Sequence, residues 1–196
     1  MGSYYYLVAQ LPYLIYGQGV PMSSGAFRAL AGEKLALSDA ALLDCCVLDP
    51  ARAPALATSS VFLDRWLQWE QALRLNLARG RAQKTRRDFP FEAPQHPVDA
   101  VTAAKAALSL DSPLEAEFFL DKARWGAIES FEGIDYFGRN KVYAYLLKLL
   151  LLERHALFEA EEGFAEYRTI YASIMNAAPL GAAGLGAIST ESGEAT

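Results

Sequence analysis

The sequence predicts an all-α fold, a helical bundle built as one body or as two lobes. Two observations indicate helices: apolar residues recur at helical spacing in the long segments, and helix start and stop signals flank those segments. A third, the lack of a repeat at a fixed short period, argues against a solenoid and so favours a bundle. The chain has 196 residues, of which 53% are hydrophobic and 21% charged. A chain of this size and composition can bury a core without disulfides or metals.

Residues 1–88 are predicted to form an N-terminal helical lobe. Its opening aromatic stretch, residues 4–16, is interrupted by Pro12, and its pattern is compatible with a strand or a helix. Short helices are expected to begin at Ser23 or Ser24 and at Ser38, whose hydroxyls can accept from first-turn amides. A long helix is predicted over residues 60–79. Its apolar face contains Phe62, Trp66, Trp69, Leu73 and Leu77.

A proline-rich connector, residues 89–97, separates this lobe from a C-terminal helical bundle predicted over residues 98–178. Ser112 and Pro113 form a strong helix start, and Gly133 is a natural terminator. The other helices are expected over residues 98–108 and 138–158. A last amphipathic helix is expected to follow, with one apolar face turned toward the bundle. That face consists of Phe164, Tyr167, Tyr171 and Ile174. Residues 179–196 are expected to be disordered.

The composition favours a cytoplasmic protein. The formal charge of −5 does not suggest nucleic acid as a partner, and the only two cysteines, Cys45 and Cys46, are adjacent and apolar in context. They are predicted to be buried thiols in a reducing compartment. No signal peptide or myristoylation motif is expected at the N-terminus. The most apolar stretch, residues 142–152, is about half the length needed to span a bilayer.

No motif in the sequence predicts a catalytic, cofactor-binding or metal site. His96 and His155 lie on different segments, without ligand spacing, and are interpreted as a loop and a helix-surface histidine. The carboxylates Glu159, Glu161 and Glu162 are explained by a helix N-terminus. Glycines near the end of the chain have no Lys-Ser/Thr after them, so no phosphate loop is predicted there.

The segment 79–87 carries five cations in nine residues and is the most distinctive charged feature. Its cations are Arg79, Arg81, Lys84, Arg86 and Arg87. Three interpretations remain open: a solvated helix end whose cations complement the helix dipole, a contact for nucleic-acid phosphates, and a contact for an acidic protein partner.

Three segments carry a resemblance to a known family: YYYLVAQLP at residues 4–12, ARW at 123–125 and YLLKLLLLER at 145–154. Over most of residues 1–175 the chain resembles a bacterial family with a domain of unknown function, whose genes lie among those for subunits of V/A-type rotary ATPases. This family stands where the C subunit, the relative of the eukaryotic d subunit, is expected. An Ile-Asp pair followed by a helix-starting Asn is typical of C/d subunits. Here Ile134 and Asp135 are followed by Asn140, at a longer spacing.

The resemblance implies a non-catalytic subunit, a central-stalk coupler between the soluble head shaft and the membrane rotor ring. It would be peripheral at the inner face of the cell membrane, held through other V/A-type ATPase subunits. The expected partner-binding residues are the five cations of segment 79–87 together with Ile134, Asp135 and Asn140. A nucleic-acid-associated or regulatory helical protein using residues 79–87 is the alternative function. A small enzyme using His155 or Cys46 in a pocket between helices is a third.

Overall fold

Helices account for most of the chain that the computed structural model describes, namely residues 4–54, 57–158, 167–171 and 173, and no strand occurs in these ranges. This confirms the predicted all-α fold. The helices are α1 (Tyr5–Val8), α2 (Ser24–Lys34), α3 (Leu37–Ala41), α4 (Val61–Lys84), α5 (Val98–Ser109), α6 (Pro113–Glu132) and α7 (Arg139–Ala156). Two short 3₁₀ turns, Leu42–Cys45 and Pro50–Arg52, connect α3 to α4.

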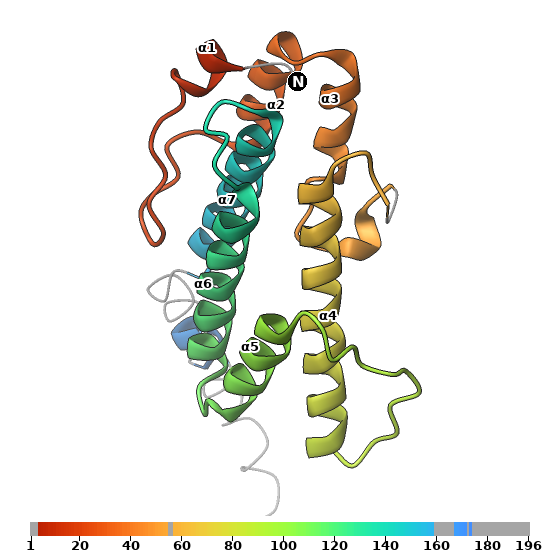
Figure 1. Ribbon diagram of the computed structural model, residues 1–196. Coiled ribbons are helices and arrows are strands. Elements are labelled where there is room, and N and C mark those ends of the chain that lie inside the picture. The colour runs from red at the N-terminus through yellow and green to blue at the C-terminus, as the bar shows by residue number, and fades with distance from the viewer. Residues whose placement is uncertain (1–3, 55–56, 159–166, 172, 174–196) are drawn as a thin grey trace, which may run out of the picture. The chain divides into compact units, whose positions relative to one another are not determined.

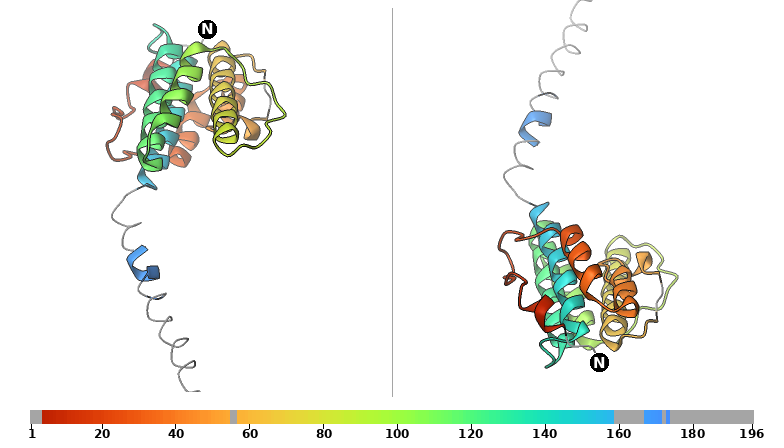
Figure 2. Two further views of the ribbon diagram at one scale, coloured as in Figure 1. Left: turned by 90° about the horizontal axis from the view of Figure 1, so that it is seen from below. Right: turned by 90° about the horizontal axis from the view of Figure 1, so that it is seen from above.

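The long helices α4, α6 and α7 form the body of the unit that runs from Met1 to Leu157 (Figures 1 and 2). Helix α6 contacts both α4 and α7, the short helix α5 packs on α4 and α6 at one end, and α2 packs on α7. The predicted apolar face of α4 is buried in this arrangement, since Trp66, Trp69 and Leu73 are at most 1% exposed. The periodicity therefore identified the core face of α4 correctly.

Helix α7 lies at the centre of the core, as its sequence predicted. Nearly every residue from Val142 to Leu152 is buried, on all sides of the helix. A helix that is apolar all round must be enclosed by its neighbours, and here α2, α6 and the N-terminal segment enclose it. No helix within the described ranges is long and apolar enough to cross a membrane.

The helix boundaries follow the capping residues in most places. The hydroxyls of Ser23, Ser60 and Ser112 each accept a hydrogen bond from a first-turn amide of α2, α4 and α6. The predicted cap at Ser38 is wrong, because α3 starts at Leu37 and no side chain caps it. The N-terminal aromatic segment, for which strand and helix were both open, forms the single turn α1 and then an irregular stretch.

The proline-rich connector, residues 89–97, is a loop between α4 and α5 inside the first unit. Helices α4 and α5 pack directly against one another on either side of it, so it does not separate two compact bodies. The second unit begins at Phe158. In it, residues 167–171 and 173 are helical, and the rings of Tyr167 and Tyr171 stack 6.1 Å apart. Phe164, Ile174 and the tail 179–196 lie outside the described residues.

Two glycines of α6 are expected to respond in opposite ways to substitution by alanine. Gly133, which ends the helix, has φ 76° and ψ −162°, a conformation that essentially only glycine adopts. We expect Gly133→Ala to lower the free energy of unfolding by about 1–3 kcal/mol. Gly126 lies inside α6 with open space where an alanine Cβ would stand, so Gly126→Ala should raise it by about 0.5–1 kcal/mol. Urea denaturation of both variants checks this pair, and changes of equal sign would contradict it.

Candidate functional site

The turn between α6 and α7 is held in one conformation by its own residues. The carboxylate of Asp135 accepts the N–H of Phe137 at 3.2 Å. A Cβ at Gly138 would overlap with the other oxygen of that carboxylate, so only glycine lets the aspartate fold over the turn. In this turn Ile134 and Tyr136 are 91% and 66% exposed.

Two of the residues expected to bind a partner at this turn meet at one cavity. Asp135 and Asn140 line a hollow of about 370 Å³ together with Asp39 of α3, Arg139 of α7 and the first turn of α4. Ile134 does not line it and faces solvent. The structure therefore brings Asp135 and Asn140 together, and places Ile134 on the outer surface beside them.

The floor of this cavity is tied together by Asp39, which the sequence did not single out. Its carboxylate accepts from the guanidinium of Arg139 at 3.2 Å and from the hydroxyl of Tyr4 at 2.5 Å. Arg139 also donates to the carbonyl of Ser59 at 3.0 Å. Burial and the hydrogen bond to Asp39 raise the pKa of Tyr4, so the phenol remains a donor at neutral pH. These contacts join the N-terminal segment, α3, the start of α4 and α7 at one end of the unit.

The same end presents exposed aromatic side chains. The amide of Tyr4 donates to the carbonyl of Phe137 at 2.7 Å, and the rings of Tyr5 and Phe137 lie 4.7 Å apart. Figure 1 shows α1 beside the α6–α7 turn. We call this surface the loop end. Its residues are Tyr5, Tyr6, Ile134, Asp135, Tyr136, Phe137 and Asn140.

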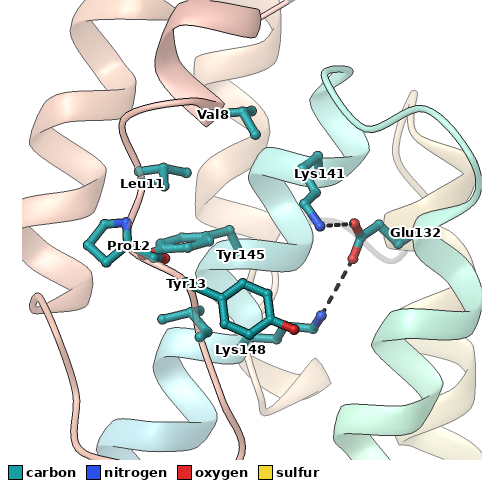
Figure 3. Close-up of a pocket in the computed structure, with 9 residues that line it drawn as sticks. Val8, Leu11, Pro12, Tyr13, Glu132, Lys141, Tyr145 and Lys148 are labelled. Atoms are coloured by element: carbon teal, nitrogen blue, oxygen red, sulfur yellow. Dashed lines mark hydrogen bonds and ion pairs between the residues drawn. The ribbon is translucent and has the colours of Figure 1, made fainter.

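A second cavity, of about 240 Å³, lies where the N-terminal segment crosses α7 (Figure 3). The carboxylate of Glu132 sits at its wall and pairs with the ammonium groups of Lys141 and Lys148, the latter at 3.5 Å. Opposite them the hydroxyl of Tyr145 donates to the carbonyl of Pro12 at 3.0 Å, and burial raises the pKa of that phenol to about 12. The charged groups of this cavity are thus satisfied internally.

A buried ion pair connects α4 to α6 in the middle of the bundle. The carboxylate of Glu70, fully buried, accepts two hydrogen bonds from Arg124, at 2.9 and 3.0 Å. A third Arg124 nitrogen donates to Asp121 at 2.9 Å. Burial alone would lower the pKa of Arg124, but Glu70 and Asp121 raise it, so the guanidinium stays charged. Two-pronged pairing of this kind fixes both distance and orientation.

From Asp121 the charges continue to the other helices. Arg154 of α7 donates to Asp121 at 2.6 Å and to Glu117 at 2.5 Å, and Arg81 of α4 lies 3.8 Å from Glu117. We call the set the ionic network; its residues are Glu70, Arg81, Glu117, Asp121, Arg124 and Arg154. The network joins α4, α6 and α7.

The cations of segment 79–87 lie on the last two turns of α4 and just after it. Helix α4 continues to Lys84, five residues beyond its predicted end at Arg79. It closes with Arg86 in the left-handed region (φ 52°), while the amide of Arg87 donates to the carbonyl of Ala82 at 2.9 Å. This is the hydrogen bond that usually accompanies a glycine at the helix end. We call the surface formed by Arg79, Lys84, Arg86 and Arg87 the basic end.

Not all five cations are available to a partner. Arg81 is engaged by Glu117, and Lys84 donates to the carbonyl of Leu108. Arg79, Arg86 and Arg87 are exposed and have no ion-pair partner among the residues that the structure describes.

Sequence reasoning missed the ionic network and part of the environment of His155. Glu70 and Arg124 each occupy a buried position at helical spacing from large apolar residues, and this was the available signal. His155 is half-buried, with ring centroids of Phe118 and Tyr16 at 4.7 and 5.6 Å, rather than on the helix surface. Cys45 and Cys46 are buried free thiols, as predicted, and burial raises the pKa of the Cys46 thiol.

Comparison with models of known protein families, with curated proteins and with solved structures gave no match to this chain. Within the described ranges, no group of three or more His, Cys, Asp or Glu side chains is placed to hold a metal ion. The geometry of the two ends and of the network between them is therefore the basis for the functional argument.

Proposed function

We propose that this chain is a non-catalytic coupling subunit of a V/A-type rotary ATPase, C/d-like, which joins the central shaft of the soluble head to the membrane rotor ring. The observation that carries the proposal is the placement of the two expected contact surfaces at opposite ends of one compact unit. In such a complex the subunit would be peripheral at the inner face of the membrane, held there by protein contacts.

The separation of the two ends follows from α4. Its first residue, Val61, lines the cavity of Asp135 and Asn140, and the basic end lies at its C-terminus. A helix of 24 residues is about 36 Å long, so one continuous rod connects the two surfaces. Figure 1 shows α6 and α7 with their axes roughly along that of α4, between the two surfaces. A coupler needs two contact faces held at a constant distance, and this arrangement supplies them.

Stiffness between the ends is supported by the ionic network. The pair of Glu70 with Arg124 and the pair of Asp121 with Arg154 tie α4, α6 and α7 together between the two ends, so a load applied at one surface meets cross-links between all three long helices. Buried, hydrogen-bonded ion pairs are expensive to separate because each partner would be left unpaired. Rigid transmission needs such cross-links and needs no reacting group.

The three segments that carry the family resemblance also lie together. Residues 4–12 lie against α7 through the bond between Tyr145 and Pro12, and the ammonium of Lys148 sits 5.1 Å from the ring centroid of Trp125. The resembling residues thus form one connected part of the core and of the loop end. The coupling role proposed for the chain comes from the resemblance that these segments carry.

The test is an affinity purification of the tagged chain from gently solubilised native membranes, followed by mass spectrometry. We expect ATPase head and rotor subunits in fixed ratio. A paired substitution at the loop end (Ile134→Ser with Tyr136→Ser) should lose one group of neighbours, and Arg79→Gln with Arg87→Gln should lose the other. Lys122→Gln, an exposed cation of α6, is the matched control. Recovery of the chain alone, or with RNA or DNA, would refute the coupler and favour the alternative use of residues 79–87.

A further inference from the structure

A cavity of about 310 Å³ lies on the seam between α4 and α5, beside the basic end, with which it shares Arg79. Residues at helical spacing on the two helices face each other across it: Asn76, Arg79, Gly80 and Gln83 from α4, and Val101, Lys105 and Leu108 from α5. Gln95 of the connecting loop completes the wall. Its volume falls at the lower end of the range for small-molecule sites.

The charge of this cavity sets it apart. Two cations, Arg79 and Lys105, line it, and among the described residues around it there is no carboxylate. The other three cavities described for this unit each contain one or more, such as Glu132, Asp135 or Asp88. Neither Arg79 nor Lys105 forms an ion pair within the described part of the chain. The seam cavity is thus electrostatically unbalanced and complementary to an anion.

Its hydrogen-bonding groups are mostly free donors. The cavity is lined by the guanidinium of Arg79 and the ammonium of Lys105. The carboxamides of Gln83 and Gln95 add further N–H donors, and that of Gln95 makes only a long hydrogen bond, 3.5 Å, to the carbonyl of Ala93. Asn76 is different, because its amide nitrogen already donates to the carbonyls of Ala72 and Pro94 and holds the loop in place. A group with several oxygens and a double negative charge would use this many donors, whereas a single carboxylate is satisfied by one arginine.

A neighbouring hollow of about 350 Å³ continues from the seam cavity, since Arg79 and Gln83 line both. Its wall includes the rings of Phe89 and Phe91, whose centroids lie 5.9 Å apart; Phe91 is 66% exposed. Two carboxylates, Asp88 and Glu92, lie beside the rings and can accept hydrogen bonds from hydroxyl or amino groups. The pair of hollows therefore offers an anion subsite and an adjoining aromatic and hydrogen-bond-accepting subsite.

We propose that the seam cavity binds the phosphate group of a small phosphorylated ligand of nucleotide size, with Arg79 and Lys105 on the phosphate and the remainder of the ligand toward Phe91. A long nucleic acid fits less well, because the carboxylates of Asp88 and Glu92 line the adjoining hollow and would repel the further phosphates of a polynucleotide. The proposal concerns the isolated chain and does not rest on the coupling function.

The test uses the purified full chain, labelled with ¹⁵N, titrated separately with inorganic phosphate, ADP and a single-stranded oligonucleotide and followed by amide chemical shifts. We expect saturable shifts at Gly80, Gln83 and Lys105 with millimolar or tighter affinity. Arg79→Gln and Lys105→Gln should each weaken binding about tenfold or more, because each removes a charged hydrogen bond. The control Lys122→Gln should leave affinity unchanged, and far-UV circular dichroism checks that every variant is folded.

The two small ligands identify the source of the phosphate. Tighter binding of ADP than of inorganic phosphate, lost in Phe91→Ala, assigns a nucleotide-like ligand; equal affinities, insensitive to Phe91, assign free phosphate. The proposal is overturned if neither ligand gives saturable shifts, if the shifts survive both cation substitutions, or if the oligonucleotide alone binds.

Discussion

Arg124→Met is expected to lower the free energy of unfolding by about 3–5 kcal/mol, because it removes the two-pronged partner of a fully buried carboxylate and leaves that charge with much weaker compensation. Arg124 is 5% exposed, and its loss would strand Glu70, which has no exposed surface. Asp121 would keep Arg154, and Glu70 would keep only the half-exposed Arg74, 2.8 Å away. Chemical denaturation in urea gives the free energy directly.

Two further variants separate the loss of charge pairing from the loss of packing. Glu70→Met combined with Arg124→Met removes both charges and fills the space with apolar atoms, so it should recover much of the stability that the single variant loses. Arg52→Met, at an 82% exposed arginine, should change stability by no more than about 0.5 kcal/mol. A single variant as stable as the unmodified chain would mean that the ionic network contributes nothing to the rigidity argued for the coupler.

Trp66→Ala should cost a similar amount, about 3–5 kcal/mol, through the cavity it leaves. The indole is fully buried, lies 6.0 Å from the ring of Trp69, and donates its N–H to the carbonyl of Val47 at 2.9 Å. Truncation would remove the packing and leave that carbonyl without its donor.

The matched control is Tyr13→Ala, since Tyr13 is 87% exposed and should change stability by less than about 0.5 kcal/mol. Trp66→Phe keeps most of the volume and allows a measurement if the alanine variant does not fold. A loss below about 1 kcal/mol in Trp66→Ala would contradict the central position of this residue in the core.

The core could be predicted from the sequence because burial at helical spacing is a local property. The stripe from Phe62 to Leu77 consists of residues three and four apart and lies where that spacing placed it. The segment of α7 that is apolar nearly all round lies enclosed at the centre of the core, as expected. The pairing of Glu70 with Arg124 is different, since 54 residues separate the partners. A charge within an apolar stripe shows that a partner is needed but does not say which helix provides it.

The residues of the candidate cavity at the loop end could likewise be predicted only where they are close in the sequence. Asp135 and Asn140 are five residues apart, and a turn brings them to one cavity. Asp39, which holds that cavity, lies 100 residues before Arg139, and its partner Tyr4 lies 35 residues earlier still, so both are beyond the reach of local pattern.

The end of α4 was predicted five residues too early, at the residue before Gly80. In the structure it is an interior residue of α4, and a Cβ there would overlap with a methyl group of Leu108. Glycine is present because α5 comes so close, and the cations that follow are good helix formers at the favourable end of the dipole. Tertiary packing, which the sequence does not display, decided this boundary.

The alternating charges of the ionic network also determine the register of the helices, that is, how far each is shifted along its neighbour. If α6 slid along α4 by one turn, about 5.4 Å, the residue facing Glu70 would become Asp121 in one direction and Ile128 in the other. The first would oppose two buried carboxylates, and the second would leave Glu70 against an aliphatic side chain. Either error is penalised by the cost of an unpaired buried charge, whereas uniform leucine surfaces would tolerate the slip. The network thus selects one register of the bundle, and with it the fixed distance between the loop end and the basic end.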